Sequence, residues 1–452
     1  MERLETFVPG PVDTLKVSNQ GRSDALRVCI VAEHASYRFG GEAVLPLHYF
    51  SGLLAANAEV WLVVHSRTRA ELEELFPQAL DRLRFVPNTM LHRLIFRLSK
   101  YLPRRVAEAT LGLLNQLLTQ FVQRKIVRRL VAEESIDVVH QPIPVSPRFP
   151  SLMSGMGAPV VIGPMNGGMD YPAAFRRTES VFTRVSIHYG RYFANFVNFW
   201  LAGKRKAALL LVANQRTRMA LPSCARGEVI EFPENGIDLR TWTAPASPGT
   251  DHPASSSRRF VFIGRLVDWK GVDMAIEAIS RVPGAELEII GTGPMQAKWK
   301  QTAEALGASD RVFFSGWLAQ KEISVRLRSA VALILPSIYE CGGAVVLEAM
   351  AAGLPVIATR WGGPADYLDE SCGILVEPSS REALVDGFAA AMQKLIAAPE
   401  LRTTLGGVGR MRAEHQFNWK NKIARILEIY EHAIRQSSLK NVDRPLARVS
   451  AE

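Results

Sequence analysis

The chain lacks any apolar run of the roughly 18–20 residues that a membrane-spanning helix requires. Its N-terminal stretch Met1–Gln20 is mixed in character and includes Pro9 and Pro11, so we expect no secretory signal there. Cysteine is scarce, and the four cysteines show neither disulfide nor metal-ligand spacing: Cys29, Cys224, Cys341 and Cys372. Scattered single cysteines are typical of a reducing compartment. Together these absences predict a cytoplasmic protein.

Acidic residues are outnumbered, because 54 lysines and arginines stand against 44 aspartates and glutamates. The formal net charge of +10 calls for an anionic partner. Charge alone leaves nucleic acid, anionic lipid and phosphorylated substrates open. No recognised nucleic-acid module surrounds the basic segments, so we expect no nucleic-acid partner.

A chain of 452 residues is too long for one ordinary core, and its strand and helix patterns form two series. In both series short apolar runs alternate with helical stretches, which predicts parallel sheets covered on both faces. The first series has expected strands at Leu26–Ala32, Val60–Val64, Leu83–Val86, Ile136–His140, Pro159–Ile162 and Leu209–Ala213. The second has them at Arg259–Ile263, Leu287–Ile290, Val312–Phe314, Val331–Leu335, Val356–Ala358 and Ile374–Val376.

Composition suggests where these parts begin and end. Residues 1–24 are interpreted as a flexible leader, and the stretch 241–258, rich in Pro, Ser and Thr, as a linker. The expected domains are 25–240, with basic and aromatic helical insertions, and 259–416, followed by a helix at 417–436 and a polar tail at 437–452.

The loop after the expected strand Val331–Leu335 holds the densest group of candidate ligand contacts. Glu340 should lie at the carboxyl end of that strand, where open α/β sheets bind ligands. Gly342 and Gly343 precede a helix that begins at Ala344, which leaves its first backbone N–H groups bare for an anion.

Glu348 falls one to two turns into the same helix. Two carboxylates flanking an anion-binding helix end suit a nucleotide sugar. Glu340 would accept hydrogen bonds from sugar hydroxyls, the diphosphate would cap the helix, and Glu348 would bind the ribose diol. The alternative is a surface glutamate on a plain loop before an amphipathic helix.

Two cations follow the first strand of the second series. Arg265 and Lys270 lie in one loop that begins at Gly264. A leaving nucleoside diphosphate gains negative charge as its bond to the sugar breaks, and preorganised cations stabilise that transition state more than the ground state. Gly291 and Gly293 end the next strand, where they could let a nucleotide base lie against the backbone; a common Gly-Pro turn is the alternative.

The first series offers further candidates at strand ends. Gly40 and Gly41 follow the first strand and would let backbone approach a ligand, although they do not form G-x-G-x-x-G. His140 ends a later strand, a position that favours a ligand contact over the more common structural histidine. The loop Gly163–Gly168 offers free amides, and Asn214 directly follows another strand.

Two segments of the first series interleave basic residues with apolar and aromatic ones. Leu91–Leu130 holds nine lysines and arginines against Glu108 alone, and Phe175–Lys206 adds several Phe, Tyr and Trp residues. Basic amphipathic helices with aromatic residues can lie in a membrane interface. The alternative is that their apolar faces belong to the core and their charges form a solvated rim.

Taken together, these motifs resemble family-four retaining glycosyltransferases of the GT-B fold. The likeness is specific over Phe260–Glu377, on the motifs Gly264–Arg265…Lys270–Gly271, Gly291–Thr292–Gly293–Pro294, Gly316–Trp317, Glu340-x7-Glu348–Ala349–Met350–Ala351 and Gly353–Leu354–Pro355–Val356–Ile357–Ala358. It is looser over the first half, where it rests on Gly40–Gly41, Asp137–Val138–Val139–His140 and Asn235–Gly236–Ile237–Asp238.

The resemblance implies two Rossmann-like domains facing across a cleft, with a final helix near Trp419 that crosses back to the first domain. Arg265 and Lys270 would bind the donor diphosphate, Glu340 the donor sugar and Glu348 the ribose. His140 would contact the sugar from the opposite domain. The remaining donor-side contacts would come from Gly40, Gly41, Gly264, Gly291, Gly293, Gly342, Gly343 and Ala344. The family usually has an aromatic residue two positions after the first glutamate, where this chain has Gly342.

No Asp-x-Asp motif occurs in the chain. Glycosyltransferases of the other common fold hold a divalent metal on such carboxylates, whereas here two cations and a helix end can neutralise the diphosphate. We therefore expect no metal and no other cofactor. The family likeness implies retention of configuration, and we hypothesise front-face displacement assisted by the leaving phosphate.

The expected function is transfer of a sugar from a nucleotide donor, with uridine diphosphate as the default, to a lipid-linked or saccharide acceptor. Cell-surface polysaccharide or glycolipid synthesis, in the cytoplasm or at the inner face of its membrane, would be the setting. One alternative is a sugar-nucleotide epimerase or phosphorylase of the same fold. Another is a non-catalytic protein that binds nucleotide sugars.

Overall fold

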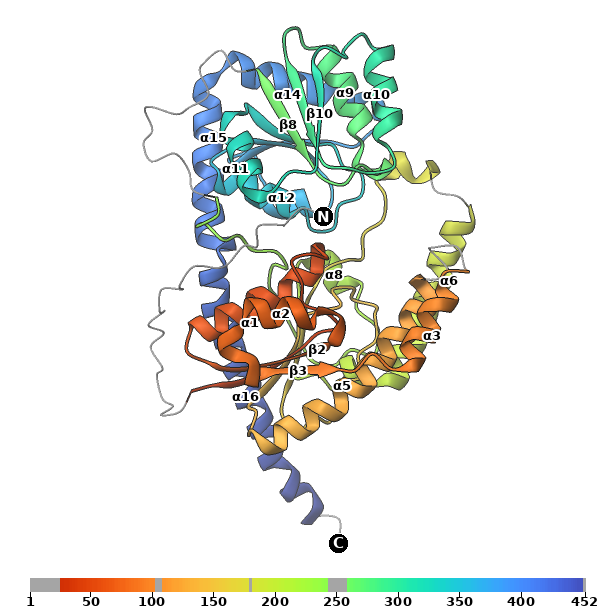
Figure 1. Ribbon diagram of the computed structural model, residues 1–452, viewed down its shortest axis with the longest axis vertical. Helices are drawn as coiled ribbons and strands as arrows, with labels where there is room; N and C mark the ends of the chain where they lie inside the picture. Colours follow the sequence, from red (N-terminus) through yellow and green to blue (C-terminus); the bar gives the residue numbers. More distant parts are fainter. Residues whose placement is uncertain (1–24, 102–107, 179–180, 243–257, 450–452) are drawn as a thin grey trace. The chain divides into compact units, whose positions relative to one another are not determined.

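The computed structural model describes residues 25–101, 108–178, 181–242 and 258–449 (Figure 1). The leader expected at 1–24 and most of the linker expected at 241–258 lie outside the described residues.

The described chain divides into two compact units. Unit 1 comprises the residues up to Gly168, Ile187–Glu234 and the chain from Ile423 on. Unit 2 comprises Met169–Ser186 and Asn235–Lys422. A short segment from the first half of the sequence therefore belongs to unit 2, and the end of the chain belongs to unit 1.

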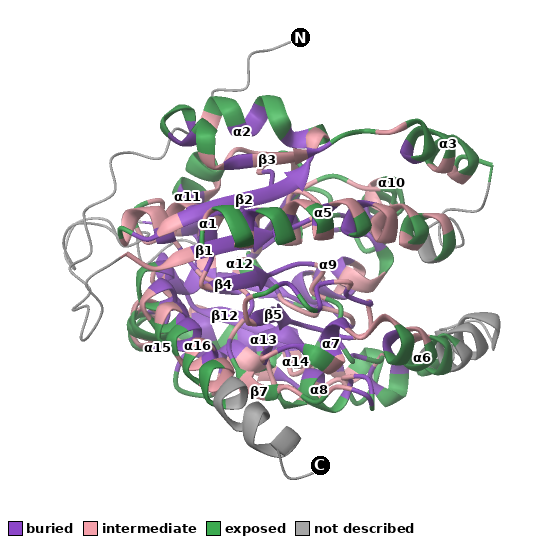
Figure 2. Ribbon diagram, turned by 90° about the horizontal axis from the view of Figure 1, so that it is seen from below, coloured by how far each residue is buried: buried purple, intermediate pink, exposed green. Residues whose placement is uncertain are grey.

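Unit 1 contains a seven-stranded parallel sheet in the order β3-β2-β1-β4-β5-β6-β7. Its strands are β1 (Arg27–Val31), β2 (Glu59–His65), β3 (Leu83–Val86), β4 (Val138–Gln141), β5 (Val160–Met165), β6 (Leu209–Val212) and β7 (Glu228–Glu231). The inner strands are almost wholly buried, as the purple ribbons in Figure 2 show. Continuous apolar strands of this kind are typical of a sheet covered on both faces.

Helices connect these strands. They are η1 (Gly41–Val44), α1 (Leu45–Ala55), η2 (Ser66–Thr68), α2 (Arg69–Leu75), η3 (Pro77–Arg82), α3 (Met90–Ser99), η4 (Glu108–Gly112), α5 (Leu113–Glu133), α6 (Val181–Leu201), α7 (Gly203–Lys206) and α8 (Gln215–Met219). Of these, α6 belongs to unit 1 from Ile187 on. The last helix, α16 (Trp419–Val449), contributes its residues from Ile423 on to unit 1, where Ile426 and Tyr430 are fully buried.

Unit 2 contains a six-stranded parallel sheet in the order β10-β9-β8-β11-β12-β13. Its strands are β8 (Arg259–Ile263), β9 (Glu286–Ile290), β10 (Val312–Gly316), β11 (Ala332–Leu335), β12 (Val356–Thr359) and β13 (Gly373–Val376). Its helices are η5 (Ala173–Thr178), η6 (Asp268–Lys270), α9 (Val272–Ser280), α10 (Gln296–Ala305), α11 (Gln320–Ser329), α12 (Ala344–Ala351), α13 (Gly363–Tyr367), α14 (Arg381–Ala397), α15 (Pro399–Arg412) and η7 (Ala413–Phe417).

Both sheets follow the same winding rule. The first strand lies in the interior, the second and third extend to one side, and the fourth and later strands extend to the other. This is the doubly wound Rossmann order, in which ligands bind outside the carboxyl ends of the strands where the winding reverses. The prediction of two Rossmann-like parallel-sheet domains is therefore confirmed. The reversal falls between β1 and β4 in unit 1 and between β8 and β11 in unit 2.

Two elements differ from the sequence prediction. The edge strand β7 has no counterpart in it, because the four residues of this strand place charged glutamates at both ends and none of them is fully buried. The helix expected at 417–436 continues to Val449, through part of the stretch interpreted as a polar tail. A polar composition does not prevent a helix from continuing.

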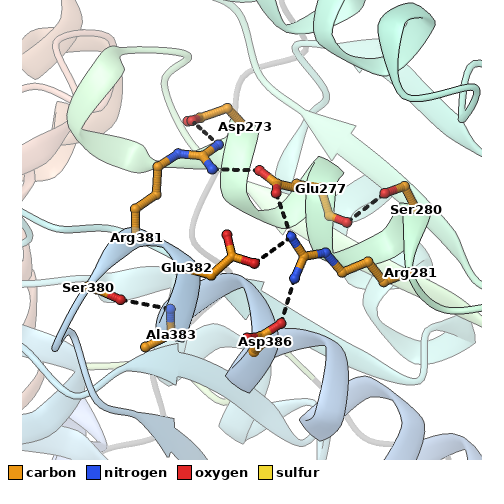
Figure 3. Close-up of polar contacts among 9 residues, drawn as sticks. All are labelled: Asp273, Glu277, Ser280, Arg281, Ser380, Arg381, Glu382, Ala383 and Asp386. Atoms are coloured by element: carbon orange, nitrogen blue, oxygen red, sulfur yellow. Dashed lines mark hydrogen bonds and ion pairs between the residues drawn. The ribbon is translucent and has the colours of Figure 1, made fainter.

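Charged side chains join α9 to α14 in unit 2 (Figure 3). Arg381 donates to Asp273 and Glu277, at 3.2 and 2.6 Å, while Arg281 pairs with Glu277 and Glu382, at 2.6 and 2.9 Å. The helix α14 begins with a side-chain cap, because the backbone N–H of Ala383 donates to Ser380 Oγ at 3.0 Å. A network of several charges contributes more than isolated surface pairs do. This network joins two helices that cover the sheet of unit 2, and so it stabilises the packing of those helices.

Candidate functional site

The winding reversal of unit 2 brings two loops together. The β8 loop runs from Gly264 to Gly271 and the β11 loop from Pro336 to Gly343. The backbone N–H of Ile338 donates to the carbonyl of Trp269 at 2.9 Å, and a Cβ on Gly271 would lie 2.5 Å from the carbonyl oxygen of Pro336. Gly271 also has a φ of +63°, which L side chains rarely adopt. The two loops therefore pack backbone against backbone at the edge where a ligand is expected.

Lys270 and Glu340, predicted from separate motifs, form an ion pair in which Lys270 Nζ contacts Glu340 Oε2. Their side chains are only 15% and 14% exposed. A charge-assisted contact of this kind is stronger when water is largely excluded. The pair holds each charge at the site, and a negatively charged ligand would compete with Glu340 for Lys270.

Arg265 lies in the same β8 loop and is exposed. It has no ion-pair partner in the part of the chain that the structure describes. A guanidinium that is not committed to a protein carboxylate remains available for a phosphate, which it can bind through two parallel N–H groups.

The helix α12 begins beside this ion pair. Gly343 precedes it with φ +72° and ψ +48°, a left-handed conformation that suits glycine, and no side chain caps the helix. A Cβ on Gly343 would lie 3.2 Å from Glu340 Cγ, so the helix start and the carboxylate are close neighbours. The uncapped N–H groups that begin at Ala344 can bind an anion by donating hydrogen bonds to it.

Glu348 lies farther along α12 and is partly exposed. Burial of its carboxyl group raises its pKa to about 7. Hydroxyl groups that donate to the carboxylate would favour its charged form again. A ribose diol would provide two such donors.

The glycines of the β9 loop have a packing reason for their identity. A Cβ on Gly291 would lie 2.0 Å from the carbonyl oxygen of Gly264, and one on Gly293 would lie 2.3 Å from that of Leu266. The close approach of the two loops therefore requires glycine at both positions. A contact of either glycine with a nucleotide base stays a prediction.

A segment that sequence reasoning does not connect with this site also lies beside it. Tyr171 belongs to unit 2, and its ring centroid is 5.1 Å from that of Tyr339, which directly precedes Glu340. Its only sequence signal is its place just after the Gly163–Gly168 loop.

In unit 1, His140 is fully buried at the end of β4. Its Nε2 lies 2.6 Å from the carbonyl oxygen of Gly163, and its Nδ1 lies 2.7 Å from the hydroxyl of Tyr430. Burial lowers the pKa of His140 to about 4, with a smaller opposite effect from the bond to Gly163. The ring is therefore neutral at neutral pH, with Nε2 donating to Gly163 and Nδ1 accepting from Tyr430. A contact of His140 with a donor sugar stays a prediction, and it requires one of these bonds to open.

Gly40 and Gly41 follow β1 with φ values of +64° and +56°. A Cβ at either position would meet no atom within 4 Å, so backbone conformation and not packing favours glycine there. Near the same edge, Arg67 Nη2 donates to Glu33 Oε1 at 2.8 Å, and Glu42 accepts from the backbone N–H of Val145 at 3.0 Å. Burial raises the pKa of both glutamates. Sequence patterns do not reveal these acids, because the residues they contact are far apart in the sequence.

Among the described residues, no three or more His, Cys, Asp and Glu side chains are grouped so that they could hold a metal ion. None of the described helices is long and apolar enough to cross a membrane. The absence of a metal or cofactor stays a prediction.

The two Rossmann-ordered units define the chain as an α/β protein of the GT-B fold. Similar arrangements occur in solved structures, where the HepE protein of Anabaena in complex with UDP gives a TM-score of 0.62 at 17% identity. That likeness covers 90% of this chain and 100% of the other. The lipopolysaccharide outer core galactosyltransferase WaaB in its apo form gives a TM-score of 0.60 at 17% identity, over 90% of this chain and 100% of the other.

Residues 251–410 match the model of the family described as glycosyl transferases group 1. Among curated proteins, the lipopolysaccharide core biosynthesis glycosyltransferase LpsE of Rhizobium meliloti is 35% identical over 34% of this chain and 44% of its own. The glycogen synthase of Mycobacterium tuberculosis is 29% identical over 52% of this chain and 56% of its own. The chain thus spans about half the length of the curated relatives it matches.

Proposed function

We propose that this protein is a retaining glycosyltransferase that moves a sugar from a nucleoside-diphosphate sugar to an acceptor hydroxyl. The observation that carries the proposal is the meeting of Lys270, Glu340 and the uncapped start of α12 where the sheet of unit 2 reverses its winding. All three lie within the segment that matches the family. The HepE protein, which is similar in fold, forms a complex with UDP.

In this proposal the donor diphosphate binds to Arg265, Lys270 and the N–H groups at the start of α12. Glu340 accepts hydrogen bonds from the donor sugar and Glu348 from the ribose. Gly264, Gly291, Gly293, Gly342 and Gly343 let backbone approach the nucleotide. His140, Gly40 and Gly41 of unit 1 are retained as candidate ligand contacts.

The chemical step follows from these assignments. As the bond between the anomeric carbon and the diphosphate oxygen breaks, its electron pair stays on the diphosphate. The acceptor oxygen attacks the same face of the sugar, and its proton passes to the leaving phosphate. Lys270 and Arg265 stabilise the charge that develops on the leaving group. No metal is needed, because two cations and a helix end already face that charge.

A thermal-shift panel of nucleoside diphosphates and nucleotide sugars tests the proposal, because a ligand that binds the native state raises the melting temperature by mass action. Donor hydrolysis and transfer to a panel of acceptors are then measured with and without EDTA. We expect binding of uridine diphosphate and turnover that EDTA leaves unchanged. Binding without turnover would favour a non-catalytic protein, and interconversion of donors would favour an epimerase. Rescue of EDTA-treated enzyme by manganese or magnesium would show a metal-dependent mechanism.

We further propose a lipid-linked acceptor, on cell-surface polysaccharide or glycolipid precursors, with the protein in the cytoplasm on an anionic membrane surface. Exposed apolar side chains on three helices support this. Of the 22 large hydrophobic side chains that are exposed in the described residues, 13 lie on or beside α3, α5 and α6. They are Met90, Leu91, Leu94, Phe96, Leu98, Tyr101, Leu114, Phe121, Tyr192, Phe193, Phe196, Phe199 and Trp200. We call these residues the interfacial set.

Cations accompany the interfacial set on or beside each of the three helices. Lys100 lies over the ring of Phe96, Lys125 over that of Phe121 and Arg205 over that of Phe199. The distances from the cationic group to the ring centroid are 5.3, 4.7 and 5.3 Å, in that order. Exposed aromatic rings beside cations suit an anionic membrane interface, where rings enter the headgroup region and cations meet lipid phosphates. In Figure 2 much of α3 and of the coloured part of α6 is green, the colour of exposed residues.

Two of these helices are fixed to one loop of unit 1. Asn198 of α6 donates to the carbonyl of Arg148 at 2.8 Å, and Arg124 of α5 donates to that of Leu152 at 2.8 Å. Lys204, after α6, is buried and donates to the carbonyl of Pro147, so it anchors this loop and is not available to lipid. These hydrogen bonds therefore hold α5 and α6, which carry part of the interfacial set, against unit 1.

Sedimentation with lipid vesicles tests the surface. We expect the protein to sediment with vesicles containing phosphatidylglycerol and to remain in solution with phosphatidylcholine alone. The double change Phe196→Ser and Trp200→Ser should weaken binding to the vesicles on the order of a hundredfold or more, because each buried aromatic contributes about 1.5–3 kcal/mol. The control is Met219→Ser, which removes an exposed apolar residue of unit 1 outside the set. Binding that is indifferent to lipid charge and to the double change would contradict the proposal.

A further inference from the structure

The segment Met169–Tyr171 lies between β5 and η5 in the sequence but belongs to unit 2. It is fixed there by Phe175, which is 7% exposed and part of the hydrophobic core of unit 2. The backbone N–H of Phe175 donates to the carbonyl of Pro172 at 2.8 Å, which forms a turn. We call Met169–Tyr171 the strap.

Each residue of the strap contacts a loop at the edge where the donor is proposed to bind. Met169 is buried, and its sulfur would lie 2.6 Å from a Cβ on Gly362, which in turn would lie 2.2 Å from the carbonyl oxygen of Glu340. The carbonyl of Asp170 accepts a hydrogen bond from Trp361 Nε1 at 2.9 Å. These contacts place the strap beside the backbone of Glu340.

Tyr171 provides the third contact. Its ring and that of Tyr339 have centroids 5.1 Å apart and planes inclined by 37°. Both tyrosines are partly exposed, so the pair offers an aromatic surface to a ligand. Tyr339 is covalently next to Glu340, and hence the aromatic surface lies beside the carboxylate that is proposed to bind the sugar.

The β11 loop itself lacks a large side chain after Glu340. Its next three residues are Cys341, Gly342 and Gly343. The backbone of Gly363 packs closely against this part of the loop. A Cβ added to Gly363 would lie only 2.1 Å from the carbonyl oxygen of Gly342. The residues that follow Glu340 in the β11 loop therefore supply no aromatic side chain, and Tyr171 adds one from another segment beside Tyr339.

We propose that Tyr171 is a specificity-determining residue for the donor sugar, held in place by Met169 and by the bond between Trp361 and Asp170. This inference rests on the proposed function of the same site. The ring presents an apolar face against which the C–H groups of a sugar ring can pack, while Glu340 binds the hydroxyls. Selection among donors then depends on which sugar hydroxyls point toward that face. A hydroxyl that loses water against the ring and finds no hydrogen-bond partner there costs binding free energy.

The test compares the affinity for nucleotide sugars with the affinity for the bare nucleoside diphosphate, measured by calorimetry on the full chain. For Tyr171→Ala, we expect the affinity for the preferred nucleotide sugar to fall about tenfold and that for the nucleoside diphosphate to stay unchanged. The ratio of turnover with the preferred donor to turnover with its epimers should fall by a similar factor. Tyr171→Phe should retain both, because it keeps the aromatic face.

Phe313→Ala, which changes an exposed aromatic on the strand β10, is the control and should leave every affinity unchanged. A merely structural strap would lower both affinities together, and that outcome would overturn the proposal. Unchanged sugar affinity and donor preference in Tyr171→Ala would also overturn it. If the wild-type protein binds no nucleotide sugar, the proposed function fails, and the inference fails with it. If the wild-type protein binds the nucleotide sugar and Tyr171→Ala binds it equally well, only the inference is rejected.

Discussion

Lys270→Met and Glu340→Gln should each lower sugar transfer by about 10²–10³-fold while the protein remains folded, because each change removes one charged contact that we assign to the transition state. Lys270 would lose its contact with the leaving diphosphate. Glu340 would lose its charge at the donor sugar while it keeps its shape. Turnover is measured at saturating donor, and folding is followed by thermal unfolding.

The ion pair between these two residues allows structural and catalytic effects to be separated. Either single change leaves the other charge with little exposure and without its partner, which is destabilising. The double variant, Lys270→Met with Glu340→Gln, removes both charges, so it should regain stability relative to the single variants. It should not regain turnover.

Two residues of α10 provide matched controls. Lys298 and Glu304 are exposed on that helix, and Lys298→Met and Glu304→Gln should leave transfer unchanged. Turnover that returns in the double variant together with stability would mean that the pair is structural, and our assignment of both residues would be wrong.

The parts of this fold that are encoded locally can be predicted from the sequence. Buried parallel strands appear as short apolar runs, and the strand predicted at Arg259–Ile263 has the same bounds in the structure. The loop positions of Lys270, Glu340 and Gly343 follow, because each comes directly after such a strand or before the next helix. The sequence does not predict that Lys270 and Glu340, 70 residues apart, pair with each other.

The less predictable features depend on contacts between distant segments. His140 ends a strand as expected, but its burial under Tyr430 depends on a helix 290 residues later in the chain. The strap carries no pattern that separates it from the neighbouring loop, and only packing reveals that it belongs to unit 2. Likewise, Gly291 suggests a ligand contact in sequence, whereas the structure gives it a packing role against Gly264.

Gly362→Ala should be among the most damaging small substitutions near the site. Gly362 has a φ of +67°, and an added Cβ would lie 2.2 Å from the carbonyl oxygen of Glu340. With φ +67° and ψ −142°, Gly362 has a backbone conformation that is open almost only to glycine, and another residue there costs about 1–3 kcal/mol. The clash with backbone adds to this, so we expect a loss of roughly 2–4 kcal/mol in the free energy of unfolding. Donor affinity should fall as well, because Glu340 must shift.

Gly353→Ala is the control matched in φ. Gly353 has a φ of +72°, but a Cβ there would meet nothing within 4 Å, so only the backbone cost applies. Chemical denaturation of both variants gives the difference, and equal losses would contradict the clash. A Cβ on Gly362 would also lie 2.6 Å from the sulfur of Met169. Adding Met169→Ala should nevertheless fail to rescue Gly362→Ala, because the carbonyl of Glu340 remains, and a β11 loop displaced at that carbonyl cannot keep its carboxylate beside Lys270.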